Sequence, residues 1–405
     1  MKLAALETFV VGNPPPGHGG RYFLFVKLTT DTGIIGYGEC YAATVGPTAM
    51  TAVIRDVFDR HLAGENPERV EAMFRRVYSA GFTQRPDPTV IGAFSGLEMA
   101  CWDIIGKDRD RPVHALLGGA LQTRLRAYTY LYPDEGEDPG AFYASPDRAA
   151  QTAAARVADG FTAIKFDPAG PYTTFGGHQP TPQDLTRSTA FCQQIRAAVG
   201  DRADLLFGTH GQFTASGAIR MAQAIAPYAP LWFEEPVPPD DVEAMATVAA
   251  QSPVPIATGE RLTTTAEFAP LLARRAVGIV QPALGRLGGI WEARKLAHLA
   301  QVFGAQFAPH LYAGPLEWAA NLQVAATCPN FLIAETIGSG TGIHADLLRK
   351  PISVEGGYIR LPDAPGLGVE LNEEVARAHP YTGDRLHLEM QDAAHRPGAD
   401  DWAGG

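Results

Sequence analysis

The stretch LWFEEPVPPD (residues 231–240) places two adjacent carboxylates, Glu234 and Glu235, directly behind three apolar residues. The apolar residues 231–233 are typical of the end of a buried strand. Desolvating two acids at such a position costs several kcal/mol unless a cation or a hydrogen-bond network compensates their charge. The stretch therefore predicts a strand that ends at a charged site, and it raises the question of which cation lies there.

The same pattern recurs on both sides of this stretch, as short apolar runs that end in polar residues and precede helical segments. The runs are RAYTYLY, AIKFD, DLLFGTH, LWFEEP, PIATGE, GIVQPA, QFAPHLY and FLIAET. Alternating strands and helices predict parallel βα units, and seven or eight of them form a TIM-like barrel with its active site at the carboxyl ends of the strands. The polar residues expected to converge there are Lys165, Asp167, His210, Glu234, Glu260, Gln281, His310 and Glu335.

The segments that flank the barrel predict an α+β capping domain, so the fold class is α/β with a (β/α)7-8 barrel and a cap. An antiparallel meander is expected from residues 2–11 and from the two runs in RYFLFVKLTTDTGIIGYGEC. Helical patterns follow at 46–62, 67–79 and 89–108. The expected boundaries are 1–122 for the cap, 123–345 for the barrel and 346–405 for a C-terminal segment that returns to the cap.

The composition excludes several classes of protein. The net charge of -11 and the absence of a Lys/Arg-rich run argue against a nucleic-acid partner. The four cysteines are far apart and form no CxxC, so neither a zinc site nor a disulfide framework is expected, which suits a reducing cytoplasm. MKLAALETFVVG is typical of a first strand rather than a signal peptide, and no apolar run is expected to span a membrane.

Several motifs in one order resemble the enolase superfamily, in the subgroup of mandelate racemase and the galactonate-type sugar-acid dehydratases. These motifs are EMACWDIIGKDRDRPVHALLGG, KFD, FEEP, GERL, QPALGRLGG and PHLY. The resemblance covers nearly the whole chain. It implies a cap that sets substrate choice and a Mg²⁺ ion held by acids that end the third, fourth and fifth barrel strands. The ion binds the substrate carboxylate while a base removes the proton from the adjacent carbon.

The resemblance makes Glu234 and Glu260 metal ligands, with buried ion pairs as the structural alternative. The third ligand is a departure from the family, because Gly208 stands where an Asp is usual. His210 lies two residues further on, on the same side of the strand, and could replace it. In the galactonate-type enzymes the matching His is instead the acid that protonates the leaving hydroxyl. Asp167 is another candidate ligand, and an imidazole ligand would make Mn²⁺ a possible metal.

The proton-transfer residues also depart from the family pattern. Lys165 and Asp167 form Lys-x-Asp where relatives carry Lys-x-Lys, so Lys165 is expected as an anchor or base and Asp167 as base, ligand or hydroxyl acceptor. A salt bridge at the barrel mouth is the structural alternative for both. His310 resembles the family His of the seventh strand, but Ala283 replaces its carboxylate partner, so His310 should be less basic. Glu335 matches the family acid that donates to or orients the substrate carboxylate.

Gly/Pro-rich loops are expected to cover the substrate. PPPGHGGRY and YSAGFTQRP carry aromatic and basic side chains and either fold over the site or form ordinary exposed loops. The insertion FDPAGPYTTFGGHQPTPQD is expected to form a third wall that includes Tyr172 and His178. The candidate substrate-binding residues are His18, Arg21, Tyr78, Phe82 and Gln281.

These observations predict a magnesium-dependent lyase that removes the proton beside the carboxylate of a sugar acid, an aldonate or aldarate, and dehydrates it to a 2-keto-3-deoxy acid. A cycloisomerase or an epimerase/racemase would use the same enediolate, and a non-catalytic ligand-binding relative is a third class. The expected assembly is a homo-oligomer of even subunit number.

Overall fold

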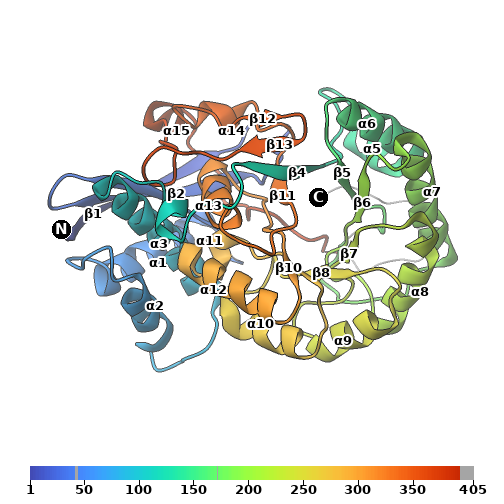
Figure 1. Ribbon diagram of the computed structural model, residues 1–405, viewed down its shortest axis with the longest axis horizontal. Coiled ribbons are helices and arrows are strands. Elements are labelled where there is room, and N and C mark those ends of the chain that lie inside the picture. The colour runs from blue at the N-terminus through green and yellow to red at the C-terminus, as the bar shows by residue number, and fades with distance from the viewer. Residues whose placement is uncertain (42–43, 171, 393–405) are drawn as a thin grey trace.

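The computed structural model describes residues 1–41, 44–170 and 172–392. It has two parts, a cap at one end of the molecule and a ring of strands surrounded by helices at the other (Figure 1). The C-terminal segment lies along the cap, so the two ends of the chain contribute to the same part of the structure.

The cap is built from a meander and helices at the positions that the sequence predicts. Three antiparallel strands pair in the order β1 (Leu3–Gly12), β2 (Tyr22–Thr30) and β3 (Ile35–Cys40). They are followed by α1 (Pro47–His61), α2 (Val70–Ser79), α3 (Pro88–Asp108) and the short α4 (Val113–Leu116). Glycines let α3 lie directly on β3, since a Cβ atom on Gly38 would come within 1.9 Å of the Gly96 carbonyl oxygen.

Helix α3 corrects one expectation. By length and composition it could cross a membrane, with a mean hydropathy of 1.2 over its most apolar window, so the expectation that no such run exists was wrong. However, 89% of that window is buried inside the structure, as in the core helix of a folded domain. Its apolar residues pack against β3 and α1 of the cap.

All eight predicted barrel strands are present, and they pair in parallel in chain order. They are β4 (Arg124–Tyr130), β5 (Ala163–Phe166), β6 (Asp204–Phe207), β7 (Trp232–Glu234), β8 (Ile256–Thr258), β9 (Ile279–Val280), β10 (Gln306–Phe307) and β11 (Ala334–Thr336). Strand β11 pairs with β4, and the Leu332 amide donates to the Phe307 carbonyl at 2.9 Å. These contacts connect both ends of the strand series around the barrel.

The helices between the strands form the outer layer of the barrel (Figure 1). They are α5 (Pro139–Ala144), α6 (Pro146–Ala158), α7 (Pro182–Val199), α8 (Ala215–Ile225), the 3₁₀ turn η1 (Ala226–Tyr228), α9 (Val242–Gln251), α10 (Thr264–Ala273), α11 (Leu284–Leu287), α12 (Gly289–Val302) and α13 (Pro315–Ala325). The short α14 (Ile343–Asp346) follows the last barrel strand, β11. This alternation is the pattern expected of βα units.

The interior of the barrel is filled by one buried layer to which each strand region contributes a side chain. Its two aromatic rings, Tyr128 and Trp232, meet edge to face at 5.4 Å. The members are Tyr128, Ala163, Leu206, Trp232, Ala257, Ile279, Ala308 and Ile333. Side chains two residues apart on a strand point to the same side, so the next inward positions lie one layer closer to the carboxyl ends of the strands. This layer is therefore the floor of the predicted site.

The described part of the C-terminal segment contacts both the barrel and the cap. It first adds β12 (Val354–Glu355) and β13 (Tyr358–Arg360), and β13 pairs antiparallel with β4. Helix α15 (Glu373–Ala378) then lies beside β1, and the Tyr381 amide donates to the Val10 carbonyl at 2.9 Å. Residues 393–405 of the predicted segment lie outside the described residues.

Buried carboxylates of the cap accept hydrogen bonds from the beginnings of two barrel helices. Glu98 of α3 accepts from the Ile290 and Trp291 amides of α12 at 2.7 and 3.0 Å. Glu39 of β3 accepts from the amides of Gly314 and Glu317 at 2.6 and 3.0 Å, at the start of α13. The first amides of a helix have no partner within it and attract negative charge. These contacts therefore fix the cap over the barrel.

Replacing Glu98 with alanine is expected to lower the free energy of unfolding by about 3 kcal/mol. The change leaves the Ile290 and Trp291 amides and the Trp102 indole without their acceptor, and each unsatisfied donor costs about 1–3 kcal/mol. Urea denaturation measures the effect. Replacing Glu243, which forms an exposed ion pair, is the control and should cost less than about 1 kcal/mol. An equal loss in the free energy of unfolding for the two variants would contradict the role of Glu98 in fixing the cap to the barrel.

Candidate active site

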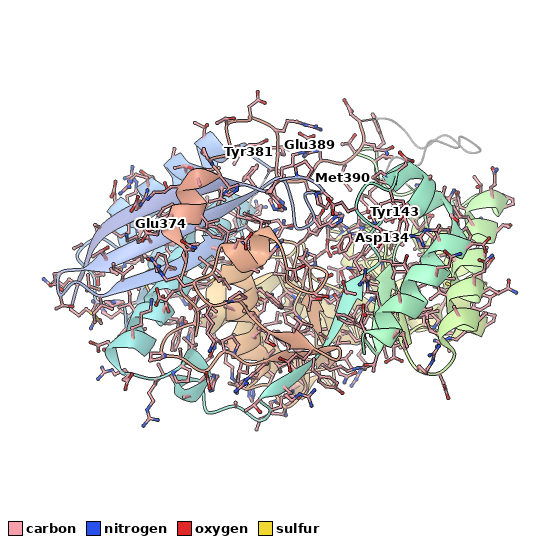
Figure 2. All side chains as sticks on the ribbon, turned by 90° about the horizontal axis from the view of Figure 1, so that it is seen from above. Asp134, Tyr143, Glu374, Tyr381, Glu389 and Met390 are labelled. Carbon is pink, nitrogen blue, oxygen red and sulfur yellow. The ribbon has the colours of Figure 1, made fainter. Side chains whose placement is uncertain are left out.

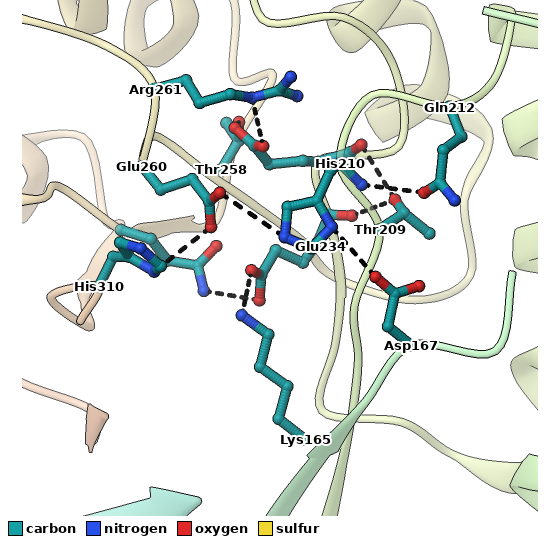
Figure 3. A network of polar contacts seen from close by, with 12 residues as sticks. Lys165, Asp167, Thr209, His210, Gln212, Glu234, Thr258, Glu260, Arg261 and His310 are labelled. Carbon is teal, nitrogen blue, oxygen red and sulfur yellow. Dashed lines mark hydrogen bonds and ion pairs between the residues drawn. The ribbon is translucent and has the colours of Figure 1, made fainter. Parts of the chain in front are cut away.

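A network of polar side chains lies at the carboxyl ends of the barrel strands, as predicted (Figure 3). Several members follow the floor layer by two residues, including Lys165 after Ala163 and Glu234 after Trp232. Gln281, His310 and Glu335 follow their own floor residues in the same way. The period of two along each strand is what turns these side chains inward.

Lys165 is the cation that compensates Glu234. Its ammonium lies 2.5 Å from Glu234 Oε1 and 3.6 Å from Glu335 Oε1. Burial opposes the charge, but Glu234 and Glu335 hold the pKa of Lys165 well above its usual range. Glu234 Oε2 accepts from the Trp232 indole and from the Gln281 amide, each at 3.0 Å. Gln281, a predicted substrate-binding residue, thus uses one of its amide hydrogens within the site.

Glu235 is held apart from Glu234 by a separate cation. Its Oε2 accepts from Arg261 Nε at 2.8 Å, and Glu235 Oε1 lies 3.4 Å from the Thr258 hydroxyl. The cation that compensates Glu235 is thus Arg261, which follows strand β8. Glu235 therefore has a structural role next to the site, while Glu234 faces the barrel mouth.

His310 lies between two carboxylates. Its Nδ1 is 3.0 Å from Glu335 Oε2 and 3.3 Å from Glu260 Oε2, and Glu335 also accepts from the Leu311 amide at 2.7 Å. Burial lowers the pKa of His310, but Glu260 and Glu335 outweigh it and raise this pKa to about 9. The expectation that Ala283 makes His310 less basic was therefore wrong, because two other strands supply the negative charge.

Asp167 and His210 form a second carboxylate–imidazole pair across the mouth from His310. Asp167 Oδ2 lies 3.0 Å from His210 Nδ1, and His210 Nε2 lies 3.7 Å from Glu260 Oε1. The ring of Tyr172, from the predicted third wall, packs against the His210 ring with centroids 4.4 Å apart. Burial opposes a charged imidazole, but Glu260 and Asp167 raise the pKa of His210.

The side chains present suit a hard divalent cation in charge and donor chemistry. Four carboxylates, those of Asp167, Glu234, Glu260 and Glu335, face one lysine and two imidazoles, so negative charge is in excess. Asp167 Oδ1, Glu260 Oε2 and the Gln281 carbonyl oxygen are buried without a hydrogen-bond partner in the described chain. Carboxylate oxygens are the ligands that Mg²⁺ prefers.

The same residues are not yet arranged as a metal cage. Among the described residues, no three His, Cys, Asp or Glu side chains converge on a common metal position. The reason lies at Glu234, whose two oxygens are already bound by Lys165, Trp232 and Gln281. An ion in this site would share Glu234 with Lys165.

The two predicted substrate-binding residues of the first cap loop have different surroundings, and only His18 contacts a tyrosine of the barrel mouth. His18 stacks on Tyr132, with centroids 3.9 Å apart, and burial lowers the pKa of His18 to about 4. Arg21 instead binds the C-terminal segment, through the Leu386 carbonyl at 2.7 Å and Glu389 at 3.3 Å. The neutral ring of His18 is therefore the loop side chain near the site, and the Arg21 cation binds the C-terminal segment.

The C-terminal segment connects this loop to the third wall. Figure 2 shows Glu389 and Met390 between Tyr381 on the cap side and Tyr143 on the barrel side. Beyond them, the Gln391 amide donates to the Tyr172 carbonyl at 3.0 Å, and the Thr174 amide donates to the Gln391 carbonyl at 3.1 Å. The segment thus holds in place the loop that carries Tyr172.

The structure does not bring the remaining loop candidates to the network. Phe82 is 97% exposed, and Tyr78 stacks on Phe74 of its own helix at 5.8 Å, near Lys295 of α12. The backbone amide of His178, in the third wall, donates a hydrogen bond to the Gln212 carbonyl, two residues after His210 in the chain.

The tyrosines at the barrel mouth were not among the site residues predicted from the sequence. Tyr130 lies near the rings of Tyr132 and Tyr143, at 5.1 and 6.1 Å. Burial, followed by the hydroxyls of Tyr143 and Tyr172, raises the pKa of Tyr130 well above its usual range. The signal was present in RAYTYLY, because Tyr130 and Tyr132 continue the period of two that starts at Tyr128 of the floor.

Comparisons with known proteins match most of the chain, including both the cap and the barrel. The family described as mandelate racemase / muconate lactonizing enzyme, N-terminal domain, matches residues 18–118, and the family described as enolase C-terminal domain-like matches residues 147–375. The chain is 33% identical to a D-galactonate dehydratase of Ralstonia nicotianae over 384 residues, which are 93% of each protein. It is 31% identical to a D-xylonate dehydratase of Haloferax volcanii over 94% of this chain and 89% of that protein.

Solved structures agree with these matches. A mandelate racemase/muconate lactonizing enzyme-like protein from Roseovarius sp. TM1035 is 64% identical, with a TM-score of 0.95 over 97% of this chain and 99% of that chain. A mandelate racemase/muconate lactonizing enzyme from Sulfitobacter sp. is 65% identical, with the same TM-score and the same coverage. The likeness thus includes the cap, the barrel and the described part of the C-terminal segment.

Proposed function

Since the chain belongs to the enolase superfamily, in its mandelate racemase/muconate lactonizing enzyme branch, we propose that it is a magnesium-dependent sugar-acid dehydratase. Its substrate would be an aldonate or aldarate and its product a 2-keto-3-deoxy acid. The observation that carries the proposal is the network of Lys165, Glu234, Glu260, His310 and Glu335 at one end of the barrel. The dehydratases that this chain resembles support the reaction class.

Glu234 and Glu260 are the acids that would hold Mg²⁺. When bound, the ion supplies positive charge against the enediolate that forms once the proton beside the carboxylate is lost. Lys165 adds a second charge, because its ammonium lies between Glu234 and Glu335 and is kept protonated by both. Positive charges placed beside a developing anion in a buried site are especially effective at lowering the activation barrier to proton loss.

His310 is proposed as the acid of the reaction. Its Nδ1 lies 3.0 Å from Glu335 Oε2, a carboxylate that favours the protonated ring, and the protonated ring can deliver its proton to the hydroxyl that leaves from the neighbouring carbon. Glu335 orients the ring through the contact with Nδ1, so that Nε2 is the atom left to face the substrate. Loss of the hydroxyl gives an enol, which becomes the 2-keto acid.

The test is a turnover screen of the purified protein with Mg²⁺ against a panel of aldonates and aldarates. Formation of 2-keto acid and deuterium exchange at the carbon beside the carboxylate are followed together. Exchange with inversion and no loss of water would instead favour an epimerase, and conversion of a lactone would favour a cycloisomerase. Neither exchange nor product from any member would favour the non-catalytic relative.

Removal of divalent metal is expected to lower turnover by more than about 100-fold, since the enediolate then loses its main electrostatic support. Dialysis against a chelator, followed by addition of Mg²⁺, measures the loss and its recovery. Stability of the fold after dialysis, followed by circular dichroism, is the control. Full activity in protein shown by elemental analysis to be metal-free would contradict the proposal.

The assembly is proposed to be a homo-oligomer of even subunit number, located in the cytoplasm. The described C-terminal segment closes the cap against the barrel within one chain, which leaves the outer faces of the barrel for a second copy. Light scattering at working concentration tests the subunit number, and a stable monomer would count against it.

A further inference from the structure

We propose that His210, oriented by Asp167, is the third protein donor to the metal ion and takes the place of the carboxylate that Gly208 lacks. The inference rests on the proposed function only in assuming that Glu234 and Glu260 bind a divalent ion. It makes Asp167 a positioning residue, which acts through His210.

The position directly after β6, where a third carboxylate would stand, is crowded by its neighbours. A Cβ atom on Gly208 would lie 3.3 Å from Lys165 Cε and 3.6 Å from Asp167 Cβ, so a longer side chain there would meet both. Gly208 instead allows Lys165 to reach Glu234. Glycine supplies no side-chain donor, and the next position on the same side of this strand region is His210, which can supply one.

The pair of Asp167 and His210 has the arrangement that metal-binding histidines use. A ligating imidazole commonly donates its other ring N–H to a carboxylate, which fixes the tautomer and the ring orientation. Asp167 Oδ2 lies 3.0 Å from His210 Nδ1, so Nδ1 can donate to this carboxylate, and in a metal-bound form Nε2 would be the nitrogen that carries the lone pair. Gln212 accepts from the His210 amide at 2.9 Å and Tyr172 packs on the ring, so both backbone and ring are held.

The free nitrogen faces the expected metal ligand. His210 Nε2 lies 3.7 Å from Glu260 Oε1. Two donors about 2.1 Å from one ion are about 3.0 Å apart at a right angle and about 4.2 Å apart on opposite sides, so the observed separation fits a shared ion. His210 and Glu260 thus form a prearranged half of the site, and Glu234 completes it when the ion competes with Lys165 for its oxygens.

This assignment predicts an altered metal preference. Imidazole is a better partner for Mn²⁺ and later transition metals than for Mg²⁺, which prefers oxygen. The competing interpretation of the same geometry is a charged His210 that forms an ion pair with Glu260 and gives its proton to the substrate. The two differ in one observable, which is a bond between the metal and a nitrogen.

The experiment loads the full-length protein with Mn²⁺ and records electron spin-echo envelope modulation, which detects nitrogen bound to manganese. Nitrogen modulation is expected in the wild type and should be lost in His210→Asn, with a Kd for Mn²⁺ raised at least about 30-fold. Asp167→Asn should keep the modulation and raise the Kd about 10-fold to 100-fold. Binding of Mg²⁺ should change less than binding of Mn²⁺ in both variants.

Two matched histidine variants identify the source of the nitrogen. His310→Asn, across the mouth, and His18→Asn, in the cap loop, should each retain the modulation. Circular dichroism and thermal unfolding verify that all variants fold. Modulation that survives in His210→Asn, or wild-type protein that binds Mn²⁺ without nitrogen modulation, would overturn the proposal.

Failure of the proposed function gives a different result. If the protein shows nitrogen-ligated Mn²⁺ but dehydrates no sugar acid, the proposed dehydratase function is contradicted and the assignment of His210 as a ligand is kept. Protein that binds neither Mn²⁺ nor Mg²⁺ would overturn both.

Discussion

Replacing His310 with asparagine is expected to lower kcat for sugar-acid dehydration by about 10³-fold while the fold stays intact. General acid–base residues contribute about 10²-fold to 10⁴-fold, and an amide keeps a hydrogen bond but cannot deliver a proton. The backbone carbonyl of His310 accepts from the Asn321 amide at 2.9 Å, and this contact does not depend on the imidazole. Steady-state kinetics with the sugar acid identified in the screen measures the loss.

Deuterium exchange separates the two roles open to His310. If it is the acid for the leaving hydroxyl, exchange at the carbon beside the carboxylate survives in His310→Asn while dehydration stops. If exchange is lost as well, His310 is the base. His344→Asn is the matched control, since this buried histidine near the cap bonds the Ala313 carbonyl and has no contact with the network among the described residues. Wild-type rates of both reactions in His310→Asn would remove this residue from the mechanism.

The barrel and its polar edge were predictable because they depend on local periodicity. Runs such as AIKFD and LWFEEP carry the strand, its inward side and its terminal charge within a few residues. The floor layer and the site are then two successive inward positions, as for Ala163 and Lys165. The cap meander was predictable for the same reason, since its strands are neighbours in the chain.

The electrostatics of the site were not predictable, because they depend on distances between strands that are far apart in sequence. The absence of a carboxylate at Ala283 suggested a weakly basic His310, but Glu335 and Glu260 reach the same ring. Arg261 could not be assigned to Glu235 from sequence, since it follows the next strand and only the fold brings it within 2.8 Å.

The loop side chains that lie near the site could not be predicted either, for a different reason. A Gly/Pro-rich loop has no periodic pattern that says which way its side chains turn, so Phe82 and His18 looked equivalent. In the structure one is 97% exposed and the other stacks on Tyr132. The contact between Gln391 and Tyr172 joins segments more than 200 residues apart, and nothing local marks it.

Replacing Lys165 with methionine is expected to abolish measurable dehydration, with a loss of at least about 10³-fold in kcat, and to destabilise the protein. Removing one group that stabilises a developing anion costs about 10²-fold to 10³-fold, and Lys165 also orders Glu234, the proposed metal ligand. Removing one partner of a buried ion pair costs about 3–5 kcal/mol, because the remaining charge loses its compensation. Kinetics and urea unfolding measure the two effects.

Two further variants separate catalysis from stability. Lys107 forms a comparable ion pair with the buried Asp103 at 2.8 Å, but it does so in the cap, so Lys107→Met should lose stability and keep turnover. The double variant Lys165→Met/Glu234→Gln removes both charges of the site pair and should recover much of the lost stability while staying inactive. Recovery of turnover together with stability in this double variant would mean that Lys165 serves the fold alone. Inactivity of the single variant Lys165→Met, assayed where it remains folded, would show that the reaction requires the Lys165 charge, since Glu234 is intact in that protein.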